Sequence, residues 1–106
     1  MGPRQKMQAT EYKVTLVGPT GSGKTSFLRA ITGAPPPTGP TLGVNVVVHN
    51  IDRAHRIHFW DTGGSSPNDY TKGSDLVVHF DQREIVQPAV RMANILRQLH
   101  YSASRL

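Results

Sequence analysis

The sequence predicts a single α/β domain, with a sheet of about four strands and two to three helices, in a chain of 106 residues. Short runs of β-branched residues suit strands, and two longer segments repeat apolar residues at helical spacing. A glycine-rich stretch also separates the first strand from the first helix. We expect residues 1–10 to form a flexible tail and residues 11–106 to form the domain.

The first strand is predicted at residues 12–17, where apolar and polar residues alternate until Gly18 and Pro19 end the pattern. A helix is expected from Lys24 onward, and Gly33 suits its C-terminal end. The residues predicted to form its buried face are Phe27, Leu28 and Ile31.

The middle of the chain predicts a pair of strands between two loops. Residues 34–40 are rich in proline and glycine and are expected to form a loop. A second strand is predicted at 44–51, a turn at 52–54 and a third strand at 56–60. Residues 61–74 contain many small and polar residues and predict a flexible loop.

The last two elements are a short strand and a helix. Residues 76–80 form an apolar run that suits a strand buried on both faces. A helix is predicted over 85–100, where Pro88 is tolerated only in the first turn. We expect the fourth strand to be an edge of the sheet and the first helix alone to cover one sheet face. The predicted buried face of the last helix is Ala89, Met92, Ala93, Leu96 and Leu99.

Composition excludes several classes of protein. The hydrophobic share of 37% and the charged share of 18% are typical of a globular domain. No apolar run approaches the ~20 residues of a transmembrane helix. The chain has no cysteine, and Lys6 stands where the myristoylation pattern requires Ser or Thr, so we expect no lipid anchor. We therefore expect an intracellular protein, cytoplasmic or nuclear.

The net charge of +5 has no clear nucleic-acid pattern. The basic residues are scattered and form no stripe with interleaved aromatic residues, which favours a solvated surface over a nucleic-acid interface. The histidines show no metal-binding spacing. His49, His55 and His58 predict a surface patch on the hairpin rather than a set of metal ligands.

Residues 18–25, with the sequence GPTGSGKT, fit the pattern G-x-x-x-x-G-K-[ST] at every fixed position. Glycines allow a tight turn in which successive N–H groups point into one concavity and hold phosphates; a turn that binds nothing is the alternative. Lys24 brings a positive charge to the β- and γ-phosphates, and Thr25 offers a hydroxyl to Mg²⁺. The predicted nucleotide-binding residues of this segment are Gly18, Thr20, Gly21, Ser22, Gly23, Lys24, Thr25 and Ser26.

Two later positions complete this predicted site. Asp61 begins a D-x-x-G pattern at the end of the third strand, and Gly64 ends it. Asp61 suits Mg²⁺ through a water, and the Gly64 N–H suits the γ-phosphate. Thr41 precedes the second strand and is expected to fold over the nucleotide, where its hydroxyl completes the Mg²⁺ shell. The predicted metal ligands are therefore Thr25, Thr41 and Asp61, and Thr41 and Gly64 are expected to sense the γ-phosphate.

These motifs resemble the first three motifs of the Ras-like small GTPases, a family of P-loop NTPases. The stretches P-T-L-G-V at 40–44 and W-D-T at 60–62 are most similar to its Ran and Rab branches. The resemblance implies a nucleotide switch that binds GTP or GDP with Mg²⁺. It also implies that a protein partner contacts two switch-like segments, 34–43 and 61–74.

The sequence departs from the family in ways that affect function. Ser65 stands where the family has the glutamine that orients the attacking water, so no residue is assigned a catalytic role. The base-recognition motif N-K-x-D does not occur, and no aromatic residue lies between Phe27 and Thr41. We expect nucleotide binding with slow or absent hydrolysis. The alternative is a pseudo-GTPase module that engages or competes for partners of a full-length relative, and another P-loop enzyme is a third possibility.

Overall fold

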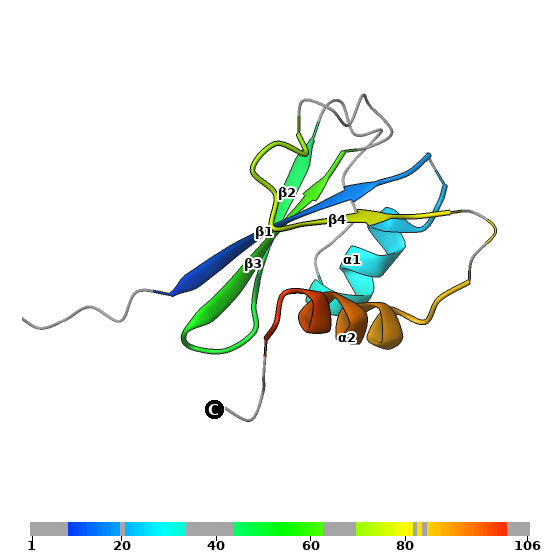
Figure 1. The fold of residues 1–106 in the computed structure, drawn as a ribbon. Coiled ribbons are helices and arrows are strands. Elements are labelled where there is room, and N and C mark those ends of the chain that lie inside the picture. The colour runs from blue at the N-terminus through cyan, green and yellow to red at the C-terminus, as the bar shows by residue number, and fades with distance from the viewer. Residues whose placement is uncertain are drawn as a thin grey trace, which may run out of the picture.

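A computed structural model describes residues 9–19, 21–33, 44–62, 70–81, 83 and 85–101. These residues form a four-stranded sheet with two helices, as Figure 1 shows, so the predicted α/β fold is confirmed. The elements are β1 Thr10–Val17, α1 Lys24–Thr32, β2 Asn45–Asn50, β3 His55–Asp61, β4 Leu76–His79 and α2 Pro88–Gln98. Most bounds lie within one or two residues of the prediction, and α2 is shorter at both ends.

The strand order in the sheet is β2-β3-β1-β4. Strand β1 pairs in parallel with both β3 and β4, whereas β2 pairs with β3 in antiparallel orientation. The predicted position of β4 at an edge of the sheet is therefore confirmed. Because β1, β3 and β4 run in the same direction, their carboxyl ends meet at one edge of the sheet. In parallel α/β sheets this edge is where ligands bind.

The hydrophobic core lies on one face of the sheet. Strand alternation directs Val14 and Leu16 of β1 and Ile57 and Phe59 of β3 toward the helices, and all four side chains are fully buried. The rings of Phe27 from α1 and Phe59 meet edge to face, with centroids 5.9 Å apart. We call this face of the sheet the helix face and the opposite one the outer face.

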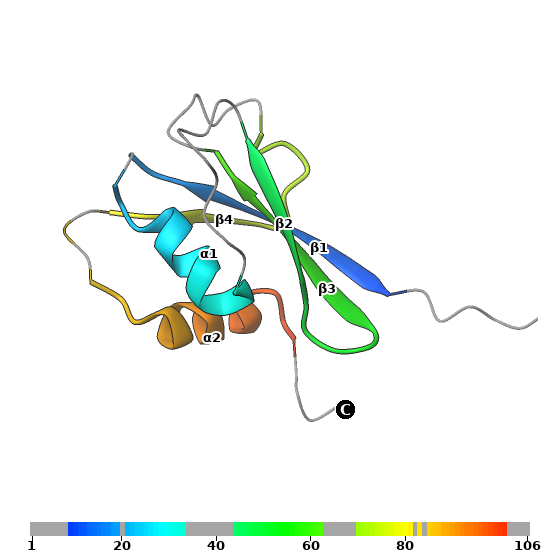
Figure 2. The same ribbon diagram turned by 180° about the vertical axis from the view of Figure 1, so that it is seen from behind.

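Both helices cover the helix face (Figures 1 and 2), so the prediction that α1 alone covers one face is wrong. Ile95 and Leu99 of α2 belong to the same core cluster as Phe27 of α1. A right-handed crossover from β4 to a further parallel strand beyond it would place α2 on the outer face, opposite α1. The position of α2 is therefore not that of a crossover helix onto a fifth strand.

The buried face of α2 also differs from the prediction. Ala89 and Ala93 are exposed, and the buried residue missing from the predicted face is Ile95, which is 1% exposed. Met92, Leu96 and Leu99 were placed correctly, since they pack on or in the core. The helix is rotated toward its larger side chains, because burying isoleucine removes more apolar area from water than burying alanine. Neither described helix has the length and hydropathy of a membrane span, and the longer, α2, has 11 residues.

The segment before β4 docks against β1 on the outer face. The hydroxyl of Thr15, whose side chain is fully buried, lies 2.6 Å from that of Ser74 and 3.2 Å from the Tyr70 carbonyl. The Asp75 carboxylate accepts the Lys13 amide at 2.8 Å. The prediction of a flexible loop over 61–74 is therefore wrong at both ends, because Asp61 ends β3 and residues 70–74 are bound to β1; residues 63–69 lie outside the described part.

The three histidines of the hairpin do not form the predicted patch. His49 and His55 lie on the helix face, and burial lowers the pKa of His49. His58 lies on the outer face, where its Nε2 is 2.8 Å from the Glu11 carboxylate. Positions 55 and 58 differ by an odd number of residues, so a regular strand directs their side chains to opposite faces.

A polar cluster around Asp52 ties the end of α2 to the hairpin. Its carboxylate accepts hydrogen bonds from the Tyr101 hydroxyl at 2.8 Å and the Ala54 amide at 2.6 Å, and contacts His55 Nδ1 at 2.9 Å. Partial desolvation raises the pKa of Asp52, but these three interactions outweigh it and lower the pKa from 3.8 to about 2. The carboxylate form is therefore favoured in the folded chain.

Replacing Asp52 with asparagine should lower the free energy of unfolding at neutral pH. Because folding lowers this pKa, the stabilisation is present above the unfolded value of 3.8 and is lost as pH falls toward about 2. Urea unfolding at several pH values should therefore show a difference between wild type and variant that shrinks below about pH 4. Asp81→Asn is the control, since Asp81 is 44% exposed and should change stability by less than ~0.5 kcal/mol. A difference that is constant with pH would contradict this role of Asp52.

Candidate phosphate-binding site

The loop between β1 and α1 has the backbone that its glycines predict. Gly21 and Gly23 have φ angles of 82° and 100°, a region that residues with a Cβ rarely occupy. A Cβ on Gly23 would meet nothing within 4 Å, so the backbone conformation rather than space requires glycine there. The first turn of α1 has no side-chain cap and no acidic residue among the described atoms. Its N–H groups are therefore available to an anion.

Gly18 also has a positive φ angle, of 150°, and is required for a second reason, which is contact with the end of β4. A Cβ at Gly18 would lie 2.6 Å from the carbonyl oxygen of Phe80 and 3.0 Å from its Cβ. The Phe80 amide donates to the Val17 carbonyl at 2.8 Å and so holds the two segments together. The start of the loop and the end of β4 are therefore packed backbone to backbone.

The side chain of Lys24 lies inside the loop and is only 5% exposed. Its ammonium donates to the carbonyls of Gly18 at 2.5 Å and Pro19 at 3.0 Å, and to the Ser22 hydroxyl at 3.3 Å. Desolvation lowers the pKa of Lys24, and the nearby carboxylate of Asp61 opposes that effect. All three hydrogen-bond acceptors are neutral, so the positive charge of Lys24 is not cancelled by them.

Asp61 reaches the loop from the end of β3. Its side chain is 1% exposed, and its Oδ2 accepts a hydrogen bond from the Thr25 hydroxyl at 3.2 Å. The neighbouring Thr62 fixes this strand end, because its hydroxyl donates to the Leu16 carbonyl at 3.1 Å. The hydroxyl and carboxylate oxygens of Thr25 and Asp61 are ligands that suit Mg²⁺.

This donor set fits a Mg²⁺ ion that is shared with phosphates. Within the described ranges no group of three or more His, Cys, Asp or Glu residues lies close enough to hold a metal by itself. Mg²⁺ commonly takes one or two carboxylates from the protein and completes its shell with substrate phosphates and water. One carboxylate and one hydroxyl beside a phosphate loop match that arrangement.

Most of the predicted site residues meet at this edge of the sheet. Asp61 lies beside the loop and the first turn of α1, which contain Gly18, Gly21, Ser22, Gly23, Lys24, Thr25 and Ser26. Thr20, Thr41 and Gly64 lie outside the described residues, as does the whole of segment 34–43. Sequence reasoning missed Thr62 and Phe80. The W-D-T stretch could have pointed to Thr62 as a site residue. No sequence pattern indicates the contact of Phe80 with Gly18.

A glycine-rich loop between a parallel strand and a helix, with a buried lysine and an aspartate from the next parallel strand, defines a P-loop nucleotide-binding domain. A sequence profile of the family described as 50S ribosome-binding GTPase matches residues 13–102. The chain therefore belongs to this GTPase family, and its fold is that of the Ras-like small GTPases. No curated protein sequence matches the chain significantly.

Solved structures show the same fold. The Arl6 BBS3 small GTPase from Trypanosoma brucei with bound GppNp is similar at a TM-score of 0.57 and 21% identity, over 84% of this chain and 52% of that chain. GDP-bound IFT22 from T. brucei has a TM-score of 0.55 and 20% identity, over 84% of this chain and 55% of that chain. GTP-bound IFT22 from T. brucei has a TM-score of 0.51 and 21% identity, over 81% of this chain and 52% of that chain. The chain thus spans about half the length of these proteins.

Proposed function

We propose that the chain binds a nucleoside triphosphate together with Mg²⁺. Lys24 and the N–H groups of the loop and of the first turn of α1 would bind the β- and γ-phosphates. Thr25 and Asp61, with Thr41, would hold the Mg²⁺ ion, which neutralises phosphate charge when bound. The observation that carries this proposal is the hydrogen bond between Thr25 and Asp61, which brings two residues 36 positions apart together beside the phosphate loop.

The switch behaviour of the family is part of this proposal. Thr41 and Gly64 would sense the γ-phosphate, and segments 34–43 and 61–74 would contact a protein partner. The assignment to the Ran and Rab branches rests on the stretches P-T-L-G-V and W-D-T, and an intracellular location rests on the composition. These proposals depend on the sequence motifs, since most of the residues concerned lie outside the described part of the chain.

Titration with fluorescent GTP and ATP analogues, with and without Mg²⁺, tests the proposed binding directly. We expect saturable binding of both nucleotides that weakens when EDTA removes Mg²⁺, because the ion neutralises charge between the phosphates and Asp61. Circular dichroism must show that the chain is folded in both buffers. A folded chain that binds neither nucleotide would contradict the proposal.

Hydrolysis by the isolated chain should be slow, at or below ~10⁻⁴ s⁻¹, compared with ~3–5 × 10⁻⁴ s⁻¹ for Ras itself. The reason is Ser65, whose short hydroxyl replaces the glutamine that orients water. Single-turnover release of phosphate from GTP measures the rate. Ser65→Gln should raise it, and a wild-type rate near ~10⁻² s⁻¹ would show that another residue, with Arg83 the first to test, is catalytic.

An exposed apolar surface favours a second function, that of a pseudo-GTPase interaction module. Val46 and Val48 of β2 are 42% and 49% exposed on the outer face, on the same side as the partly buried Trp60. Apolar side chains grouped on an exposed face are typical of protein interaction sites. In this function the chain engages or competes for partners of a full-length small GTPase. This second function predicts that the folded chain binds such a partner equally well with and without nucleotide.

A further inference from the structure

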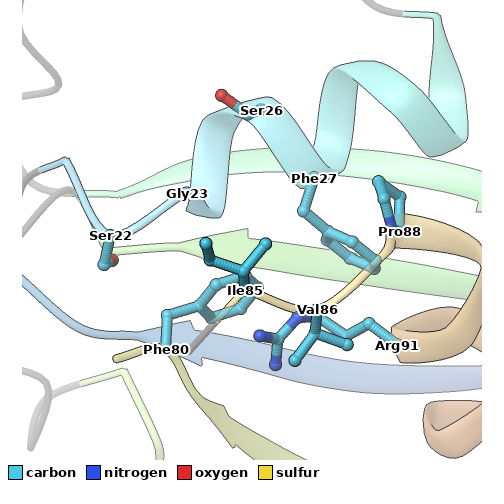
Figure 3. Close-up of a pocket in the computed structure, with 9 residues that line it drawn as sticks. All are labelled: Ser22, Gly23, Ser26, Phe27, Phe80, Ile85, Val86, Pro88 and Arg91. Carbon is cyan, nitrogen blue, oxygen red and sulfur yellow. The ribbon is translucent and has the colours of Figure 1, made fainter. Parts of the chain in front are cut away.

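A cavity of about 210 Å³ adjoins the phosphate loop on the side of α2. Figure 3 shows it between the start of α1 and the segment that leads into α2. Ser22 and Gly23 of the phosphate loop line one side, and Ile85, Val86 and Arg91 line the other. A ligand bound by the loop amides would therefore have this cavity beside it.

The position of α2 creates the cavity. Because α2 lies on the same face as α1, the residues that lead into it pass the N-terminus of α1 rather than the outer face. Phe80 closes the inner wall, where its ring centroid lies 5.8 Å from that of Phe27. The contact of Phe80 with Gly18 holds this wall of the cavity against the phosphate loop.

The cavity walls contain a planar cationic group, the guanidinium of Arg91, and apolar side chains. The guanidinium of Arg91 lies 4.1 Å from the centre of the Phe80 ring, which is a cation–π contact. Among the residues that the structure describes, Arg91 has no carboxylate partner within ion-pair distance. The side chain of Ile85 is 97% exposed although it lines the cavity, an unusual position for a large apolar residue.

The size and lining favour a single ring system. The volume is smaller than the roughly 300–1,000 Å³ of pockets that take a drug-sized ligand. Arginine planes and aromatic rings bind nucleic-acid bases by stacking, which tolerates any base because every base has a π face. Apolar residues such as Ile85 and Val86 suit the faces and C–H edges of the same ring.

We propose that this cavity holds the base of the bound nucleoside triphosphate, stacked against Arg91 and covered by Ile85 and Val86. This inference rests on the proposed function, since the phosphates must first bind to the adjacent loop. The chain thus supplies a base site from the segment between β4 and α2, although the motif N-K-x-D is absent from the sequence.

We expect this base site to discriminate weakly between guanine and adenine, because stacking tolerates any base. No described residue that lines the cavity carries a carboxylate, the group that would accept the N1–H and N2–H₂ protons of guanine. Sites that hydrogen-bond the distinguishing group can discriminate by 10⁴-fold or more, whereas a stacking site lacks that penalty. We therefore expect the affinities for GTP and ATP to agree within about tenfold.

The test compares three ligands, GTP, ATP and inorganic tripolyphosphate, each with Mg²⁺. Arg91→Ala should weaken both nucleotides about tenfold and leave tripolyphosphate unchanged within about twofold, because only the nucleotides carry a base. Arg97→Ala is the matched control, since it removes the same charge from an exposed position of α2 outside the cavity. Ile85→Ser and its control Val90→Ser repeat the comparison at exposed apolar positions, where folding is not at risk.

The outcomes separate the two proposals. If Arg91→Ala and Ile85→Ser bind nucleotides as wild type does, or if tripolyphosphate weakens equally with Arg91→Ala, the base site is wrong and the phosphate site stands. A preference for GTP above about a thousandfold would also overturn the stacking site, because hydrogen bonds would then read the base. If the folded wild-type chain binds none of the three ligands, the proposed function fails and the base site with it.

Discussion

Replacing Lys24 with alanine should weaken the binding of GTP and Mg²⁺ by about a hundredfold or more. Hydrogen bonds to a charged group contribute about 1.5–3 kcal/mol each, and a hundredfold change corresponds to ~2.7 kcal/mol. The ammonium lies inside the loop, within hydrogen-bond distance of the Gly18 and Pro19 carbonyls, so its removal takes a positive charge out of the loop itself. Equilibrium titration with a fluorescent GTP analogue measures the change.

The control for this variant is Lys72→Ala. Lys72 is exposed, and among the described residues it interacts through its backbone carbonyl alone, which accepts a hydrogen bond from Lys13, so its replacement removes one charge without touching the loop. The affinity of the Lys72→Ala variant for GTP should stay within about twofold of wild type, because salt screens the interaction between exposed, distant charges. Urea unfolding must show that Lys24→Ala is folded, because the side chain is buried. A folded Lys24→Ala protein with unchanged affinity would overturn the proposed phosphate site.

The second large effect is expected for Gly18→Ala, which should lower the free energy of unfolding by about 2–6 kcal/mol. The φ angle of 150° at Gly18 is costly for a residue with a Cβ, at about 1–3 kcal/mol. The new Cβ would also lie 2.6 Å from the Phe80 carbonyl, and such overpacking costs about 1–3 kcal/mol. A domain with a total stability of about 5–15 kcal/mol would lose a large part of it.

Gly33→Ala separates these two causes. Gly33 ends α1 with a φ angle of 70°, and a Cβ there would meet nothing within 4 Å, so only the backbone cost of about 1–2 kcal/mol remains. Urea unfolding, followed by the fluorescence of the single tryptophan, measures both variants. Equal losses of stability in Gly18→Ala and Gly33→Ala would show that the contact with Phe80 adds no cost to a Cβ at position 18.

The strands and α1 were predictable because their signals are local. Alternation along 12–17 and the turn at 52–54 place β1 and the hairpin correctly, and glycine at position 33 ends α1 as expected. The phosphate loop was predictable for the same reason, since its glycines, lysine and threonine are contiguous. Asp61 required one more step, the inference that two parallel strands end at the same edge.

The outer face shows where local signals were insufficient. The small and polar residues of 70–74 suggested flexibility, but Thr15 and Asp75 provide hydrogen bonds that bind this segment to β1. Thr15 itself looked like an ordinary polar position of an alternating strand, yet it is fully buried. Hydrogen bonds between residues more than 50 positions apart leave no periodic pattern in the sequence.

By itself the sequence determined the class of fold, the order of its elements and the phosphate loop, because each depends on neighbouring residues or on helix and strand periodicity. Only the tertiary structure decided that α2 lies beside α1, which of its faces is buried, and that Phe80 and Arg91 stand next to the loop. The physical reason is that packing chooses among helix faces by total buried area, and that area depends on residues distant in the chain.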